Sequence, residues 1–167
     1  MFKRYTWPAK RAIFYGRSLT VLSESRKISS VDLLRGLVWG DDSRAQTIFR
    51  LREHFPLFHG FPWKFDTVPT PQKEPPLDGD CRLILGWTAA EATRMGDYWI
   101  DTEHVLLGIL RVRSCWAARY LETTGLSLRA ARQAIQENRS SRPNYGNVPR
   151  SWPMRRWMTL LMKWGWP

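Results

Sequence analysis

The sequence predicts an all-α protein built from two tandem copies of one helical unit. The segment 100–110 has the pattern of a short buried helix, with an acidic or hydroxyl residue at its start and an apolar stripe along one face. That stripe consists of Val105, Leu106, Ile109 and Leu110. A weaker copy occupies 28–38 and aligns without a gap when Gly36 is placed on Gly108, 72 residues further along. Self-similarity at a fixed offset is typical of a repeat architecture.

The first copy is expected to span residues 1–56 and to be the degenerate one. Thr6 is the predicted N-cap of its first helix, and Ser29 or Ser30 caps the second. Apolar residues at helical spacing predict a third helix over 45–54. No clear pattern for a fourth helix follows it.

The second copy is expected to span residues 80–137, after a linker at 57–79 that is dense in proline and aromatic residues. Gly96 ends its first helix, the third is expected over 114–123, and Ser127 caps the last. Four helices with short loops predict a compact bundle, and two such four-helix units would pack as pseudo-symmetric halves.

The C-terminal part divides into a polar linker at 138–150 and a cationic, Trp-rich segment at 151–167, which predicts a short amphipathic helix. The surface of this tail is expected to include Arg155, Arg156, Trp157, Lys163 and Trp164. Three roles stay open for it: packing on the repeats, docking to an anionic membrane surface or a partner protein, and contact with nucleic acid. Nucleic acid is the least favoured because the basic residues are sparse.

The composition bounds the location and the partners of the chain. Its 167 residues carry a net charge of +11, and residues 138–167 hold six of the 26 Lys and Arg but none of the 15 Asp and Glu. Positive charge favours association with nucleic acid, anionic lipid or acidic proteins without specifying a fold. Cys81 and Cys115 match no zinc or disulfide pattern, which predicts buried or half-buried thiols in a reducing compartment. No signal peptide and no run of 18 apolar residues is evident, so we expect a cytoplasmic protein, with peripheral attachment at the membrane as an option.

Three consecutive segments of the second copy together resemble a known family. They are Ala89-Ala-Glu-Ala-Thr-Arg-Met-Gly96, Thr102-Glu-His-Val-Leu-Leu-Gly-Ile-Leu110 and Ala117-Ala-Arg-Tyr-Leu-Glu-Thr-Thr-Gly-Leu-Ser-Leu128. This pattern resembles the Clp repeat, the paired N-terminal domain of the Clp unfoldases, which are AAA+ ATPases. The resemblance covers roughly residues 5–137, strongly in the second copy and weakly in the first.

No catalytic set of residues is visible in the sequence. A Clp motor needs a phosphate-binding loop of the form Gly-x-x-x-x-Gly-Lys-Ser/Thr, and this sequence has none. His54, His59 and His104 stand far apart, and no pair has metalloprotease spacing. We therefore expect no catalytic activity, cofactor, metal or small-molecule substrate.

The resemblance implies candidate partner-binding residues. Family members bind adaptors and substrates through these repeats, and some hold a phosphorylated arginine between a threonine that starts the first helix and the glutamate of the Thr-Glu-His segment. Here the first copy keeps Thr6 but has Val31 at the glutamate position, and the second keeps Glu103 but has Asp78 at the threonine position. Because neither copy has the full pair, phosphoarginine binding is disfavoured. The partner-binding candidates are Thr6, Asp78, Glu103 and His104.

The function predicted from these observations is a non-catalytic protein-binding module in protein quality control. Its partner would be a substrate, an adaptor, or a Clp-type ATPase or protease. The alternative is a scaffold at a membrane surface or on nucleic acid that acts through its basic, Trp-rich tail.

Overall fold

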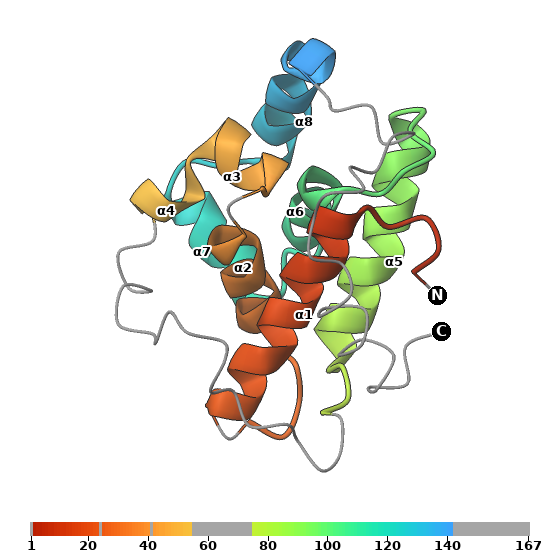
Figure 1. Ribbon diagram of the computed structural model, residues 1–167. Helices are drawn as coiled ribbons and strands as arrows, with labels where there is room; N and C mark the ends of the chain where they lie inside the picture. The colour runs from red at the N-terminus through yellow and green to blue at the C-terminus, as the bar shows by residue number, and fades with distance from the viewer. Residues whose placement is uncertain (1, 24, 41, 55–74, 142–167) are drawn as a thin grey trace.

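The computed structural model describes residues 2–23, 25–40, 42–54 and 75–141, and all regular structure in these ranges is helical (Figure 1). The helices of the first repeat are α1 (Trp7–Leu22), α2 (Ser30–Trp39), α3 (Arg44–Phe49) and α4 (Leu51–His54). Those of the second repeat are α5 (Gly79–Arg94), α6 (Thr102–Arg111), α7 (Trp116–Thr123) and α8 (Leu128–Glu137), followed by the short 3-10 turn η3 (Arg139–Ser141). The prediction of an all-α fold is confirmed.

The predicted offset of 72 residues recurs in the helix boundaries. Helices α1 and α5 each have 16 residues, and α2 and α6 each have 10. Their starts at positions 7 and 79, and at 30 and 102, are both 72 apart. Ser29 and Asp101, which are the N-caps of α2 and α6, differ by the same number. The two repeats therefore begin with the same helix pair, without insertion or deletion.

Two short backbone contacts show that the repeats are related by an approximate dyad. A parallel bridge joins Tyr5 to Ile100, and a second joins Ile28 to Leu77. Adding 72 to one residue of the first bridge and subtracting it from the other gives the second bridge. The flanking hydrogen bonds follow the same rule, since Thr6 N donates to Ile100 O at 2.8 Å and Asp78 N donates to Ile28 O at 3.0 Å. The segment that enters the first helix of each repeat is thus paired with the segment that enters the second helix of the other.

Glycines set the close approach of the helices inside each repeat. A Cβ on Gly36 would lie 1.9 Å from the Ala12 carbonyl oxygen of α1, and a Cβ on Gly108 would lie 2.6 Å from the Ile84 carbonyl oxygen of α5. No side chain fits at either distance, so only glycine lets α2 and α6 pack on their partner helices. The glycine alignment that revealed the duplication is therefore a packing constraint present in both halves.

A single hydrophobic core extends through both repeats. Residues 102–110 of α6 are all buried. The buried surface of this helix is therefore larger than the single stripe that the sequence predicts. The reason is its position, because α6 packs chiefly on α5 and also contacts helices of the first repeat. A short apolar helix enclosed by both halves needs no polar face.

The first repeat departs from the sequence prediction after α3. One helix was expected over 45–54, but the chain leaves the helix at Arg50, whose φ of 45° lies in the left-handed region. The next residue, Leu51, is buried, and it begins the one-turn helix α4. The left-handed residue costs a non-glycine side chain about 1–2 kcal/mol, and burial of Leu51 offsets that cost. In the second repeat α7 begins at Trp116, two residues later than expected, because Cys115 is its N-cap.

Candidate functional site

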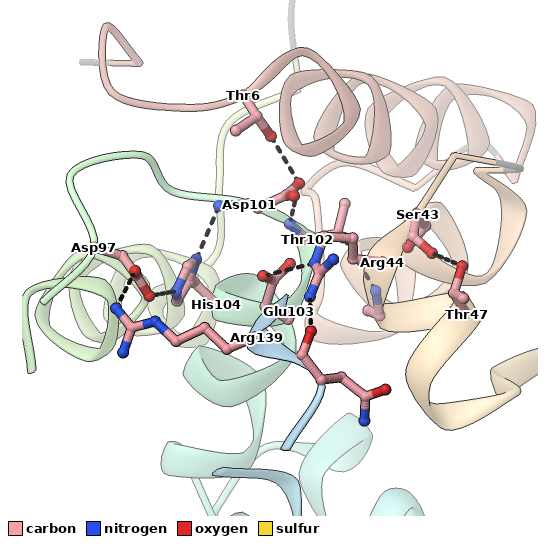
Figure 2. A network of polar contacts seen from close by, with 12 residues as sticks. Thr6, Ser43, Arg44, Thr47, Asp97, Asp101, Thr102, Glu103, His104 and Arg139 are labelled. Atoms are coloured by element: carbon pink, nitrogen blue, oxygen red, sulfur yellow. Dashed lines mark hydrogen bonds and ion pairs between the residues drawn. The ribbon is translucent and has the colours of Figure 1, made fainter. Parts of the chain in front are cut away.

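Most of the predicted partner-binding residues lie in a polar network around the N-terminus of α6 (Figure 2). We call this the α6 network. It consists of Thr6, Arg44, Asp97, Asp101, Glu103, His104 and Arg139. Asp101, Glu103 and His104 are each at most 1% exposed. The centre of the network is therefore buried between segments from both repeats, and Arg139 lies exposed at its edge.

Asp101 connects the two repeats as the N-cap of α6. Its Oδ1 accepts hydrogen bonds from Thr6 Oγ1 at 2.7 Å and from Thr102 N at 2.8 Å. Burial, together with the negative charge of Glu103, raises the pKa of Asp101 from 3.8 to about 7, although the two hydrogen bonds act in the opposite direction. The carboxyl group of Asp101 thus holds its proton well above the pH at which an exposed aspartate loses it.

The pKa of Asp101 predicts a pH-dependent stability. The folded state binds this proton more tightly than the unfolded state. The contribution of Asp101 to the free energy of unfolding is therefore full below about pH 4 and is lost as the pH rises towards about 7. Each pH unit in that window removes up to about 1.4 kcal/mol. Asp101→Asn mimics the protonated form, so its free energy of unfolding should decline less from pH 4 to 7 than that of the wild type. Urea titrations at several pH values measure both, and parallel pH profiles would contradict the assignment.

His104 occupies a position that usually holds Glu or Gln in a capping box. Its Nδ1 accepts a hydrogen bond from Asp101 N at 2.9 Å, so the ring proton lies on Nε2. That nitrogen faces Asp97 Oδ2 at 3.2 Å, and Asp97 also accepts a hydrogen bond from Arg139 Nη2 at 2.9 Å. Both ring nitrogens of His104 are therefore engaged within the protein, and they fasten the start of α6 to the loop before it and to η3.

Glu103 is fully buried and forms an ion pair with a residue of the first repeat. Arg44 Nε lies 3.1 Å from Glu103 Oε1, and Arg44 Nη2 donates to the carbonyl oxygen of Asn138 at 3.1 Å. Arg44 is itself 8% exposed. The guanidinium beside this carboxylate is thus supplied by the chain, and it also fixes the end of α8.

Thr6 and Asp78 occupy dyad-related positions as the N-caps of α1 and α5. The hydroxyl of Thr6 accepts a hydrogen bond from Ala9 N at 3.3 Å and donates to Asp101, so it contacts the other repeat. Asp78, which is partly exposed, accepts a hydrogen bond from Cys81 N at 2.7 Å. The structure brings Thr6, Glu103 and His104 into one network and leaves Asp78 outside it. Contact of any of the four with a partner stays a prediction.

The position in the first repeat that is dyad-related to the Glu103–Arg44 pair has a different chemistry. Val31 and Trp116 stand there in place of Glu103 and Arg44. One hydrogen bond is common to both positions: Ala45 N donates to Thr102 Oγ1 at 3.1 Å, and Ala117 N donates to Ser30 Oγ at 3.5 Å. The first-repeat position is therefore apolar where the second-repeat position is ionic.

Sequence reasoning missed three members of the α6 network, Arg44, Asp97 and Arg139. Each belongs to a loop or helix end, where no local pattern signals an ion pair with a distant residue. The offset of 72 aligns Arg44 with Trp116, and that mismatch concealed its role. The only available signal was that a buried glutamate needs a cation.

Some predictions fall on residues that the structure does not describe. The tail residues Arg155, Arg156, Trp157, Lys163 and Trp164 belong to this group, so the membrane-surface alternative stays a prediction. Over the ranges that are described, no helix is long and apolar enough to cross a membrane. The same ranges contain no group of three or more His, Cys, Asp or Glu suited to a metal ion.

Comparison with known proteins yields partial sequence matches. No protein-family model matches the chain. It is 44% identical over 54 residues to the negative regulator of genetic competence ClpC/MecB of Bacillus subtilis. It is 37% identical over 54 residues to the chaperone protein ClpB of Oceanobacillus iheyensis. Each match covers 32% of this chain and only 7% of the length of the relative.

Comparison with solved structures covers more of the chain. The N-terminal domain of the caseinolytic protease associated chaperone ClpD from Arabidopsis thaliana superposes with a TM-score of 0.58 at 19% identity, over 84% of this chain and 97% of that one. A structure from preliminary investigations of a malarial protein secretion system superposes with a TM-score of 0.61 at 16% identity, over 81% and 94% of the two chains. At these identities the likeness establishes a shared fold.

Proposed function

We propose that this chain, which has the fold of a Clp N-terminal domain, is a non-catalytic module that binds another protein. Its partner would be a substrate, an adaptor, or a Clp-type ATPase or protease. The observation that carries the proposal is the pair of dyad-related repeats, which superposes on almost the whole length of the ClpD N-terminal domain. The short sequence match to ClpC/MecB supports the same origin.

The contacts of the α6 network argue against a catalytic role for its buried side chains. Asp101, Glu103 and His104 contact groups of the chain itself and are buried. A general acid or base needs contact with the substrate proton that it moves. Asp101 and Glu103 hold the two repeats together through Thr6 and Arg44, so we infer that partners are recognised on outer surfaces of the helices.

We also propose that the second repeat does not hold a phosphorylated arginine. The glutamate that would receive it already pairs with Arg44 at 3.1 Å. An external guanidinium would have to displace an internal one that also donates to Asn138 O. The first repeat has Val31 at the corresponding position and offers no carboxylate there.

Affinity capture with purified components tests the proposed function. The tagged chain, immobilised and mixed separately with a Clp-type ATPase, its protease and an unfolded protein from the same organism, should retain at least one of them. An unrelated folded protein with the same tag provides the negative control. Failure to retain any of the three would contradict the proposal.

A further inference from the structure

The outer face of α5 exposes large apolar side chains. Leu83 is 55% exposed and Trp87 is 39% exposed, and they stand one helical turn apart. Between them lies Gly86, where an added Cβ would meet no atom within 4 Å, and Ala90 is exposed one turn beyond Trp87. We call these four residues the α5 face. Exposed apolar side chains that are contiguous on one face are typical of an interaction surface.

A guanidinium group is held at the edge of the α5 face. Arg111, the last residue of α6, lies over the ring of Trp87 with its Cζ 4.4 Å from the ring centroid. Its Nη1 is 3.8 Å from Glu91 Oε1, but Glu91 already accepts two hydrogen bonds from Arg132, one of them from Nε at 2.9 Å. One carboxylate thus faces two guanidinium groups, which leaves a net positive charge. Arg111 is one-third exposed, so this excess charge reaches the surface beside Trp87.

The surroundings of the α5 face increase its positive potential. Arg82 and Arg94 are exposed on the same helix. Of the acidic residues of α5, Glu91 is 2% exposed and is paired as described, and Asp80 is partly buried in the first turn. An apolar stripe bordered by arginines is complementary to a segment that carries both acidic and apolar residues.

The first repeat does not reproduce this arrangement. The offset of 72 places Arg11, Tyr15 and Trp39 at the positions of Leu83, Trp87 and Arg111. Arg11 lies over the Tyr15 ring with its Cζ 5.8 Å from the centroid, but it forms an ion pair with Asp42, and Tyr15 is only partly exposed. The combination of an exposed apolar stripe and an arginine with excess charge therefore belongs to the second repeat.

We propose that the α5 face binds an acidic amphipathic helix of a protein partner, with its apolar residues on Leu83 and Trp87 and a carboxylate on Arg111. The inference rests on the proposed protein-binding function and names the surface and the chemistry of the partner. Charge argues against the tail of the same chain as the occupant, because residues 151–167 contain three basic residues and no acidic one. Tryptophan and arginine are among the side chains that contribute most to protein binding.

A synthetic peptide tests the proposal on the full chain. The probe is a fluorescein-labelled amphipathic helix of leucine and glutamate, and its binding is followed by fluorescence anisotropy. We expect saturable binding to the wild type, with Kd raised at least tenfold by Trp87→Ala and at least fivefold by Arg111→Gln. Leu83→Glu, which places a charge of the same sign as that of the peptide on an exposed position of the α5 face, should also abolish binding. A peptide with lysine in place of glutamate should not bind.

Matched variants elsewhere on the surface separate a local effect from a general one. Trp116 is 44% exposed and Arg119 is exposed, both on α7. Trp116→Ala and Arg119→Gln should leave the Kd unchanged, and thermal unfolding of every variant checks that it is folded. Equal binding by the wild type, Trp87→Ala and Arg111→Gln would overturn the proposal. So would a concentration-dependent dimer that Trp87→Ala abolishes, or binding of anionic vesicles but not of the peptide, since either would assign the face to a different occupant.

The capture assay distinguishes failure of this surface from failure of the proposed function. If the wild type and Trp87→Ala retain the same Clp component equally well, the function stands and the α5 face is wrong. If neither retains any component, the function is wrong whatever the peptide shows.

Discussion

Replacing Gly36 by alanine is expected to destabilise the protein by about 3 kcal/mol or more and to leave little folded protein. The new Cβ would lie 1.9 Å from the Ala12 carbonyl oxygen and 2.9 Å from Gly16 N, both of which are backbone atoms of α1. Backbone cannot rotate away as a side chain can, so the two helices would have to separate. Circular dichroism with thermal and urea unfolding measures the loss.

Two other glycines provide graded controls for this prediction. Gly108→Ala should cost less than Gly36→Ala, because its shortest contact, at 2.3 Å, is with the side-chain oxygen of Thr88, although the Ile84 carbonyl oxygen lies at 2.6 Å. Gly86→Ala meets nothing within 4 Å in the middle of α5, so it should be neutral or stabilising by up to about 1 kcal/mol. If Gly36→Ala unfolded at the same temperature as the wild type, the close packing of α1 on α2 would be wrong.

Breaking the buried ion pair between Arg44 and Glu103 is the second change with a large expected effect. Arg44→Met leaves a fully buried carboxylate without its cation, and Glu103→Met leaves a buried guanidinium without its anion. Each substitution should reduce the free energy of unfolding by about 3–5 kcal/mol. The double variant should lose much less than the sum of the two, because no buried charge then remains. Urea unfolding of all four proteins gives the coupling energy directly.

An exposed ion pair serves as the control for this cycle. Arg50 and Glu53 lie 3.9 Å apart and are mostly exposed, so Glu53→Gln should change the stability by no more than about 0.5 kcal/mol. Additive losses in the Arg44 and Glu103 variants would mean that the two side chains do not interact. The proposal that the second repeat does not hold a phosphorylated arginine would then fail as well.

The duplication could be predicted because the close packing of the helices allows only glycine at Gly36 and at Gly108. The end of α5 could be predicted because Gly96 has a φ of 73°, a conformation that favours glycine. The N-caps Thr6 and Ser127 were predicted because a short side-chain oxygen before an apolar helical pattern has few other uses. The predicted resemblance to the Clp repeat is confirmed by the fold of the chain.

The remainder was not readable because it depends on contacts between distant parts of the chain. The helix break at Arg50 could not be predicted because no glycine or asparagine occupies that position. It follows from the burial of Leu51. Arg44 reaches Glu103 across 59 positions, and Arg111 lies over Trp87 from a neighbouring helix. Helical periodicity assigns Trp87 to neither the core nor the surface, and only the packed structure shows that it is exposed.

The proposed protein-binding function can be measured by isothermal titration of the purified chain with a purified Clp-type ATPase of the same organism, its protease and an unfolded protein. We expect saturable binding of at least one of these proteins, weakened by Trp87→Ala and Arg111→Gln and unchanged by Trp116→Ala. No heat of binding with any of the three, or turnover of ATP or peptide by the chain alone, would contradict it.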